Sequence, residues 1–582
     1  MLMGMKSDEA NPNPSAVPWW KRTVIYQIYP RSFMDGTGDG IGDLPGILSR
    51  LDSLRELGVE TLWLSPVYPG PQKDFGYDIS DYTGIHREYG TMEDFDRLVE
   101  AVHARGMKLL MDMVLNHTSD DHPWFRESAS SRDNPRRDWY VWKEGRGKGG
   151  KRPPNNWLSQ VSGSGWHRDS RSGQWYWASF LPFQPDLNWR NPLVREEMFR
   201  VLRFWLDRGV DGFRLDIIGS VYEDPEFRDN PRTWKPFSLG GEDALLFQTT
   251  LRTKNHPDNF LLARELRKLT DSYGQPEKIL IGEVFGSPET VRRYCGQDSP
   301  DGLHSVFLFQ AAETPFRAAP LRRHLEKSAG AFPDPFVPTL AFSNHDRIRR
   351  ISALKNRRNL YRMSLLLQLT APGIPCLYYG EEIGMPQARL SHRRSLDAVT
   401  GPFRNLPSPL FRLINRLFHG AVFRDECRTP MIWNGGPNGG FCPKETAPWL
   451  PLSCSPGELY SGKTGAPGED LRNFLRELIR LRRAHPALET GTFRLFSPGQ
   501  APAGAAGKAG RRILGYSRQT GEETLAVFLN LSDRRGKVSL SGTVPEILLE
   551  TGNTETAGLP GTGGLLTLPP WTGVLMRLNP PG

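Results

Sequence analysis

The stretch GFRLDIIGS, residues 212–220, places two charged side chains inside an apolar run. In a β-strand, successive side chains point to opposite faces, so Phe213 and Leu215 would share one face and Arg214 and Asp216 the other. Burying an ion pair costs desolvation energy that mutual attraction does not reliably recover, and two apolar residues would stabilise such a strand more. The pair therefore indicates a functional site.

Three other apolar runs also carry polar residues at or near their ends: KLLMDMVLNH at 108–117, KILIGEVF at 278–285 and PTLAFSNHD at 338–346. With the first stretch, three predicted strands supply the carboxylates of Asp216, Glu283 and Asp346. Such a set can cleave a glycosidic bond, because one carboxylate attacks the anomeric carbon while a second carboxyl group protonates the leaving oxygen and then activates water.

The roles of the neighbouring polar residues are less specific. If Arg214 reaches Asp216, it favours the ionised carboxylate that a nucleophile requires. A buried Asn is more often a structural residue than a catalyst, so Asn116 and Asn344 fit a supporting role equally well. A purely structural role explains Asp216 and Glu283 poorly, because both belong to a complete set of carboxylates at strand ends.

Eight short runs rich in β-branched and aromatic residues alternate with helical segments. Near-continuous apolar strands separated by helices predict an α/β protein, here a (β/α)₈ TIM barrel whose active site lies at the C-terminal ends of the strands. Apolar periodicity predicts helices at 44–58 and 194–209. The four runs not yet quoted are TVIYQIYP (23–30), VETLWLSPV (59–67), LHSVFLF (303–309) and IPCLYYGEE (374–382).

Two parts of the chain depart from this pattern. Pro, Gly, Arg and Trp dominate residues 118–180, which form too long a segment for a simple loop and predict a subdomain B inserted after the third strand. Residues 496–582 contain short runs between Gly and Pro turns, which predicts a C-terminal antiparallel β domain. The catalytic barrel is then formed by residues 1–117 and 181–495.

Four motifs give the sequence a family resemblance. DMVLNH, GFRLDIIGS, EVF and FSNHD resemble, in order, the four motif regions of glycoside hydrolase family 13, the α-amylase superfamily, and the resemblance extends from Trp19 over nearly the whole chain. It implies that Asp216 is the nucleophile, Glu283 the acid/base and Asp346 the carboxylate that stabilises the transition state. It also implies a retaining mechanism.

Three shorter motifs resemble the oligo-1,6-glucosidase and α-glucosidase branch of that family: QPDLN at 184–188, GYDISDY at 76–82 and RTPM at 428–431. The resemblance implies that Asp78 and Arg428 close the pocket around a non-reducing terminal glucose. It also implies that His117 and His345 hold the hydroxyl groups of that glucose. A closed pocket implies exo action.

The same resemblance predicts further pocket residues. Tyr77, Phe180 and Gln184 would form the wall, although Phe180 is equally explained by ordinary packing. Ile217 follows the nucleophile and would face the acceptor sugar; in this branch Val at that position accompanies α-1,6 preference, so Ile217 favours α-1,6 over α-1,4 linkages. The segment 385–427 departs from the family pattern and leaves linkage and substrate length open.

The sequence thus predicts an α-glucosidase that hydrolyses the terminal glucose of a short oligosaccharide or disaccharide. An α-glucosyltransferase or an isomerase of the sucrose isomerase or trehalose synthase type is the alternative, because a sugar instead of water can capture the same glucosyl-enzyme. A third possibility is a catalytically dead scaffold or carbohydrate-binding subunit. All three carboxylates are present, which argues against that possibility.

The stretch DGTGDGIGD, residues 35–43, predicts a structural ion site. Its oxygen donors follow the first nine positions of a calcium loop, but the twelfth position is Gly46 and lacks the glutamate of an EF-hand. The stretch resembles instead the Ca²⁺ or Mg²⁺ loop after the first strand of oligo-1,6-glucosidase relatives. The expected ligands are Asp35, Thr37, Asp39, Ile41 through its carbonyl, and Asp43.

Composition limits the partners. The formal net charge of +9 is spread along the chain without a nucleic-acid-binding motif, so solvated helix faces explain it and no nucleic-acid partner is expected. The 5 Cys have no CxxC spacing, and the N-terminal residues lack the apolar core of a secretory signal. We therefore expect a cytoplasmic protein, a monomer or homodimer, that needs no organic cofactor and does not enter a membrane.

Overall fold

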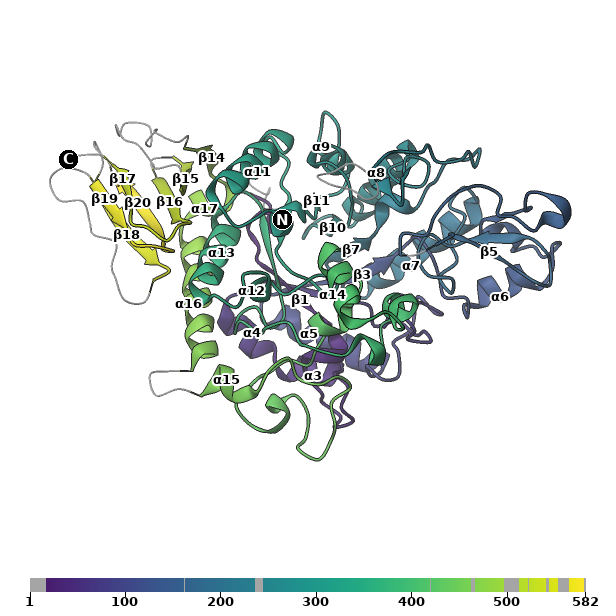
Figure 1. Ribbon diagram of the computed structural model, residues 1–582, viewed down its shortest axis with the longest axis horizontal. Coiled ribbons are helices and arrows are strands. Elements are labelled where there is room, and N and C mark those ends of the chain that lie inside the picture. Colours follow the sequence, from purple (N-terminus) through teal and green to yellow (C-terminus); the bar gives the residue numbers. More distant parts are fainter. Residues whose placement is uncertain are drawn as a thin grey trace, which may run out of the picture.

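A computed structural model describes residues 17–579, with gaps at residues 162, 419 and 522 and in five longer stretches. Figure 1 shows a central barrel, with the insertion around β5 and α6 on one side and the C-terminal sheet on the other. No helix in the described ranges is both long and apolar enough to cross a membrane. The five longer gaps are 236–243, 462–465, 497–511, 541–543 and 553–564.

The barrel consists of parallel strands in the order β11-β10-β7-β3-β2-β1-β13-β12, and a bridge between Phe307 and Thr339 closes it between β11 and β12. Each strand falls within one of the apolar runs of the sequence, so the TIM barrel prediction is confirmed. The strands are β1 (Ile25–Ile28), β2 (Thr61–Leu64), β3 (Lys108–Val114), β7 (Gly212–Asp216), β10 (Ile279–Gly282), β11 (Ser305–Val306), β12 (Thr339–Ala341) and β13 (Ile374–Tyr378).

Side chains on the barrel strands are divided between two apolar cores. Phe213 and Leu215 belong to the large core that also contains residues of the surrounding helices. A separate cluster contains Trp63, Phe307 and residues of most other barrel strands, together with Trp20 from the N-terminal helix α1 (Trp19–Arg22). Alternation therefore separates Phe213 and Leu215 from Arg214 and Asp216, as the strand pattern predicts.

Helices follow most of the barrel strands. The predicted helix 44–58 is interrupted at Arg50, where φ is −111°, and its second half ends at Gly58, which takes a left-handed φ of 98°. The predicted helix 194–209 begins two residues earlier, at Pro192, and Asn191 caps it by accepting the N–H of Leu193. The main helices are α3 (Leu44–Ser49), α4 (Leu51–Leu57), α5 (Met92–Ala104), α7 (Pro192–Asp207), α8 (Pro257–Asp271), α11 (Ala318–Ala331), α13 (Arg358–Thr370) and α16 (Pro467–Ala484).

The insertion between β3 and α7 has its own small core. An antiparallel sheet in the order β4-β6-β5 packs Trp166 and Trp177 against Val141 and Trp157. Its elements are α6 (Pro123–Ser130), β4 (Trp142–Lys143), β5 (Trp166–Arg168) and β6 (Trp175–Trp177), and a hairpin of β8 (Ala244–Leu245) and β9 (Gln248–Thr249) follows β7.

The C-terminal part is antiparallel, as predicted, with one sheet in the order β14-β15-β16-β20-β18 and a second of β17 and β19. Its first strand starts at Thr492. The strands are β14 (Thr492–Leu495), β15 (Ile513–Thr520), β16 (Glu523–Asn530), β17 (Gly536–Ser539), β18 (Val544–Glu550), β19 (Leu565–Leu568) and β20 (Gly573–Asn579).

Short helices complete the chain. The segment 385–427 folds over β13 around a small core of Phe411, Val422 and Phe423, and it contains α14 (Ser408–Leu417). The other short α-helices are α2 (Pro30–Phe33), α9 (Pro288–Arg292), α10 (Gln310–Glu313), α12 (Arg350–Ala353), α15 (Pro456–Tyr460) and α17 (Pro486–Thr490).

Candidate active site

Strand register brings the first charged group to its partners. Arg214 on β7 pairs in register with Asp112 on the neighbouring β3 and with Ile281 on β10. Its Nη1 donates to Asp112 Oδ1 and to Asp216 Oδ1, each at 2.7 Å, and its Nη2 donates to Glu283 Oε2 at 2.5 Å. One guanidinium, with 1% of its side chain exposed, therefore joins carboxylates from three neighbouring strands or strand ends.

Asp216 and Glu283 are thus held together on one cation. Burial raises the pKa of Asp216; Arg214 opposes this shift, whereas the nearby charges of Glu283 and Asp112 raise the pKa further. Burial also raises the pKa of Asp112 to about 6, again against the effect of Arg214. The negative charges of Glu283 and Asp112 thus disfavour ionisation of Asp216, whereas the cation of Arg214 favours it.

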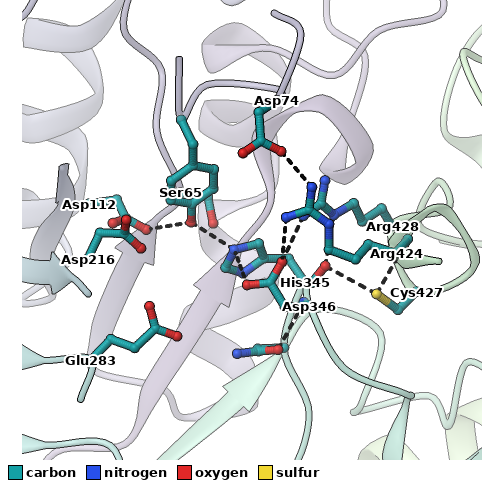
Figure 2. Close-up of polar contacts among 12 residues, drawn as sticks. Ser65, Asp74, Asp112, Asp216, Glu283, His345, Asp346, Arg424, Cys427 and Arg428 are labelled. Carbon is teal, nitrogen blue, oxygen red and sulfur yellow. Dashed lines mark hydrogen bonds and ion pairs between the residues drawn. The ribbon is translucent and has the colours of Figure 1, made fainter. Parts of the chain in front are cut away.

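Asp346 has a different environment. Its Oδ1 accepts from Arg428 Nη2 at 2.8 Å and from Arg424 Nη1 at 3.2 Å, and its Oδ2 lies 3.1 Å from His345 Nε2. Burial opposes ionisation, but His345, Arg424 and Arg428 outweigh it and hold the pKa of Asp346 well below its usual range. Asn344 supports the group by accepting the Asp346 N–H. Asp346 is therefore a permanent anion (Figure 2).

His345 connects the two groups of carboxylates. Burial lowers its pKa to about 3, so the ring is neutral. Nδ1 lies 2.8 Å from the Gln27 amide nitrogen, and Nε2 faces both Asp346 and the Tyr77 hydroxyl, 2.8 Å away, which places the ring hydrogen on Nε2. Tyr77 stacks on His345 with centroids 5.3 Å apart and donates to Asp112 Oδ2. Tyr77 thus fixes the ring at the site.

His117 and Phe180 lie beside the same group. His117 donates from Nε2 to the carbonyl of Tyr77 at 3.1 Å, and burial lowers its pKa to about 4, so it too is neutral. Asn116 lies 3.3 Å from His117 Nδ1 and donates to Ser179. The half-buried Phe180 ring is 5.8 Å from the His117 ring. The predicted contact of His117 with a glucose hydroxyl group and the predicted place of Phe180 in the pocket wall stay predictions.

The two residues predicted to close the pocket, Asp78 and Arg428, do not pair with each other. Asp78 is fully buried and accepts the backbone N–H groups of Lys73 and Asp74, so it holds a turn and does not meet Arg428. Burial raises its pKa to about 7. The pair is formed instead by Asp74 and Arg424, at 2.6 Å. The acidic group is four residues earlier in the chain, because the turn from Lys73 to Asp78 needs its own acceptor.

The other predicted pocket residues act behind this pair. Arg428 is fully buried, and besides Asp346 it donates from Nε to the His345 carbonyl at 2.8 Å. Gln184, 1% exposed, donates to Asp74 Oδ2 at 3.0 Å and so supports the carboxylate from behind. Figure 2 shows Asp74, Arg424 and Arg428 on one side of Asp346 and the Asp216 and Glu283 pair on the other.

Ile217 occupies a strained position next to the nucleophile. Its φ of 35° and ψ of 39° lie in the left-handed region, which a β-branched residue rarely adopts. Such strain costs of order 1–3 kcal/mol and is concentrated at functional sites, where the surrounding structure imposes it. It turns the chain from β7 into the short helix at 218–220, and a small crevice beside Glu283 and Phe285 includes Ile217. The residue therefore lies next to the acid/base candidate.

The comparison with protein families decides the assignment of this geometry. A model described as the alpha amylase catalytic domain matches residues 27–491, which include every residue of the site. The chain belongs to the α-amylase family. It is an enzyme of the glycoside hydrolase type. The names of its relatives show to which branch of the family it is most similar.

Relatives of this α-amylase-family enzyme are α-glucosidases and oligo-1,6-glucosidases. A probable alpha-glucosidase of Rhizobium meliloti is 37% identical over 88% of the chain and 90% of its own length. An oligo-1,6-glucosidase of Heyndrickxia coagulans is 36% identical over 93% of the chain and 96% of its own length. The branch inferred from the short motifs is confirmed.

Solved structures of the same family add other activities. An alpha-glucosyl transfer enzyme superposes with a TM-score of 0.82 at 34% identity, covering 97% of the chain and 100% of that structure. The trehalulose synthase of Pseudomonas mesoacidophila MX-45 gives 0.83 at 31% identity and the same coverage. The isomaltulose synthase of Protaminobacter rubrum gives 0.83 at 29% identity, also with the same coverage.

The carboxylates of Asp35 and Asp43 accept hydrogen bonds within the loop at 35–43. Asp35 accepts the N–H groups of Thr37, Gly38 and Gly40, and Asp43 accepts both the N–H and the hydroxyl of Thr37. No cluster of three or more His, Cys, Asp or Glu suited to a metal ion occurs within the described stretches. These hydrogen bonds close the loop on its own amides. The Ca²⁺ or Mg²⁺ site stays a prediction.

Sequence reasoning missed Asp74, Arg424 and Asp397. Arg424 forms an ion pair with each of the two aspartates. A signal existed for two of them. KDFGYD contains two acidic residues and RDECRTPM two arginines, so each motif offered a choice that spacing alone does not decide. Asp397 carries no motif, and its role follows only from the fold of the segment 385–427.

Proposed function

We propose that this enzyme is a retaining, exo-acting α-glucosidase that releases the non-reducing terminal glucose of short α-glucosides, with α-1,6 favoured over α-1,4 linkages. The observation that carries the proposal is the pair of hydrogen bonds from Arg214 to Asp216 and Glu283. One guanidinium spans only a short distance, which suits the carboxyl separation of about 5–5.5 Å in retaining enzymes and not the 6.5–9.5 Å of inverting ones.

The reaction has two displacements. An oxygen of Asp216 attacks the anomeric carbon; the bond to the leaving oxygen breaks, and that oxygen takes the proton of Glu283. In the second step, ionised Glu283 removes a proton from water, whose oxygen attacks the same carbon and breaks the glucosyl ester. Asp216 is thereby restored as a carboxylate and Glu283 as an acid. Two inversions give net retention.

The surrounding residues have distinct tasks in this reaction. Arg214 favours the ionised Asp216 against the effect of burial. Asp346, a permanent anion with 30% of its side chain exposed, can accept sugar hydroxyl hydrogens and stabilise the positive charge that develops on the ring. The Asp74–Arg424 pair stands beyond Asp346 as the closed end of the glucose site, which supports exo action.

The stereochemistry tests the central pair. Proton NMR of the first turnovers on an aryl α-glucoside should show α-glucose before mutarotation. Initial release of β-glucose would refute the arrangement of Asp216 and Glu283. Asp216→Ala should fold normally and lose turnover, and an unchanged rate in that variant would remove the proposed nucleophile.

Linkage preference is tested at Ile217, which is buried beside Glu283. We expect a wild-type ratio of kcat/KM for isomaltose over maltose above one, and Ile217→Ala should lower that ratio. Small apolar changes discriminate by about 1–3 kcal/mol, so the change in ratio should be roughly 10- to 200-fold at most. Ile217→Val is the matched control and should keep the preference.

Sugar transfer or isomerisation is the second candidate. It is favoured by the high similarity to a glucosyl transfer enzyme and to sucrose isomerases over 97% of the chain. The two activities differ only in whether water or a sugar captures the glucosyl-enzyme. Chromatography of products from maltose, isomaltose, sucrose and trehalose separates them, and a disaccharide product in excess of free glucose would overturn the hydrolase proposal.

A further inference from the structure

Arg424 lies where three acidic side chains meet. Its Nη2 donates to Asp74 Oδ1 at 2.6 Å, its Nη1 contacts Asp346, and its Nε and Nη2 donate to Asp397 at 2.9 and 2.6 Å. Asp74 and Asp346 belong to the glucose site described above. Asp397 does not: it comes from the segment 385–427, whose role the sequence leaves open.

Asp397 is built as a fixed anchor. It is fully buried, and its Oδ1 also accepts the N–H of Val399 as the cap of the short helix at 398–403, while its Oδ2 accepts the N–H of Arg424. Each carboxylate oxygen therefore has a backbone partner as well as an Arg424 partner. The carboxylate is pinned to its own segment and can in turn hold the guanidinium.

This geometry explains how a long side chain keeps one position. An Arg side chain carries about 2 kcal/mol of rotamer entropy, and ordering the side chain costs part of it. Because the guanidinium is planar, a carboxylate that binds two of its nitrogens orders it at a lower entropic cost per hydrogen bond. Asp397 is the only carboxylate in the described chain that Arg424 contacts through two different nitrogens. Asp74 and Asp346 each accept from only one nitrogen of Arg424.

We propose that Asp397 is a positioning residue that fixes Arg424, and through it Asp74 and Asp346, so that the segment 385–427 forms the closed end of the glucose site. The inference rests on the proposed function, because it assigns a wall to the pocket of an exo-acting α-glucosidase. It also sets the substrate class: the site takes an unsubstituted terminal hexose and excludes chain extension beyond it.

Asp397→Asn is the test variant because it removes the charge and keeps the helix cap, since Asn caps as well as Asp. Asp425→Asn is the matched control. Asp425 is also buried in this segment and follows Arg424 in the chain. Its Oδ2 accepts from Ser395 and from the N–H of Leu396, and among the described residues its carboxylate forms no hydrogen bond with the Arg424 guanidinium. Both variants lose one buried carboxylate of the same segment.

The measurements are the inhibition constant of free D-glucose, the kinetics on p-nitrophenyl α-glucoside and on maltose-to-maltoheptaose, and the melting temperature. Asp397→Asn should raise the glucose inhibition constant roughly 10- to 100-fold, the loss typical when an outer partner of a functional group is removed. It should also reduce the preference for short over long substrates. Asp425→Asn should change the inhibition constant less than about 3-fold, and Asp397→Glu should recover part of the loss.

Each result has one meaning. Equal glucose inhibition constants in the two Asn variants, whatever their melting temperatures, would overturn the positioning role while leaving the α-glucosidase proposal intact. A wild-type protein that cleaves no α-glucoside would overturn the proposed function and this inference with it. If Asp397→Asn fails to fold, Asp397→Ser, which keeps a capping oxygen, takes its place in the same comparison.

Discussion

Replacing Arg214 with glutamine removes the cation that joins Asp112, Asp216 and Glu283. The glutamine amide can donate to one of these groups but carries no charge. Two charge-assisted hydrogen bonds to the reacting carboxyl groups are lost, one at 2.7 Å and one at 2.5 Å. At about 1.5–3 kcal/mol each, and about 1.4 kcal/mol per factor of ten, their removal predicts a fall in kcat/KM of roughly 10²- to 10⁴-fold.

The pH profile gives a sharper signature. Arg214 lowers the pKa of Asp216 against the effect of burial, so its loss must raise that pKa. A carboxylate within about 4–6 Å of an opposite charge has its pKa lowered by about 1–3 units, and the nucleophile acts only when ionised. The acidic limb of kcat/KM should therefore move to higher pH by about 1–3 units in Arg214→Gln.

The assay is hydrolysis of p-nitrophenyl α-glucoside between pH 4 and 9, with circular dichroism to confirm folding. Arg214→Lys keeps the cation and should lose activity with a smaller shift of the acidic limb. Arg482→Gln is the control for loss of a buried arginine, since Arg482 bonds only backbone carbonyls among the described residues. It should lower stability and leave the limb in place. An unshifted limb in folded Arg214→Gln would refute the electrostatic role of Arg214.

Three further predictions follow from the site and the loop. Asp74→Asn should lower kcat/KM at least 10-fold, because Asp74 pairs with Arg424. Asp78→Asn should mainly lower the melting temperature, because Asp78 accepts the backbone N–H groups of its turn. A larger loss of kcat/KM in Asp78→Asn than in Asp74→Asn would contradict the role given to the Asp74–Arg424 pair. The unfolding free energy should fall as pH drops from about 6.5 towards 4. In this range histidines of the unfolded chain gain protons, whereas in the folded protein His117, with a pKa of about 4, and His345, with a pKa of about 3, stay largely neutral. The slope should be at most about 1.4 kcal/mol per pH unit for each histidine in urea titrations, and His117→Gln should reduce it. If the loop at 35–43 rearranges to bind Ca²⁺, calcium at 100 times its dissociation constant should stabilise the chelator-treated protein by about 2.7 kcal/mol, and an unchanged melting temperature would reject the ion.

The sequence specifies the barrel and the three carboxylates because both depend on local pattern. Alternation along β7 is enough to separate Phe213 and Leu215 from Arg214 and Asp216, and the strand ends of a barrel converge whatever the loops do. The sequence predicts the boundaries of the helices less accurately than it predicts the barrel. Apolar periodicity does not mark the interruption at Arg50, on either side of which α3 contacts α5 and α4 contacts α16.

The pocket wall depends on contacts between remote segments, and the sequence does not encode these locally. Asp74 and Arg424 are 350 positions apart, and nothing in KDFGYD distinguishes Asp74 from Asp78 until the turn consumes the oxygens of Asp78. The same is true of Asp397, whose partner is fixed only when the segment 385–427 folds over β13. Motif spacing therefore points to this region of the chain but does not identify Asp74 and Arg424 as a pair.

The packed barrel interior limits how substrates can enter the site and how products can leave it. Trp20, Trp63 and Phe307 belong to the cluster that fills the interior beneath the carboxylates, and the Arg424 contacts occupy the far end of the glucose site. If the glucose site is closed at both of these ends, as we propose, the departing sugar and the incoming water or acceptor pass through the same opening. The leaving sugar must then dissociate, or change its orientation in that opening, before water or an acceptor can attack the glucosyl-enzyme. On the proposed function, the time that this product stays at the site would set the balance between glucose release and formation of a rearranged disaccharide.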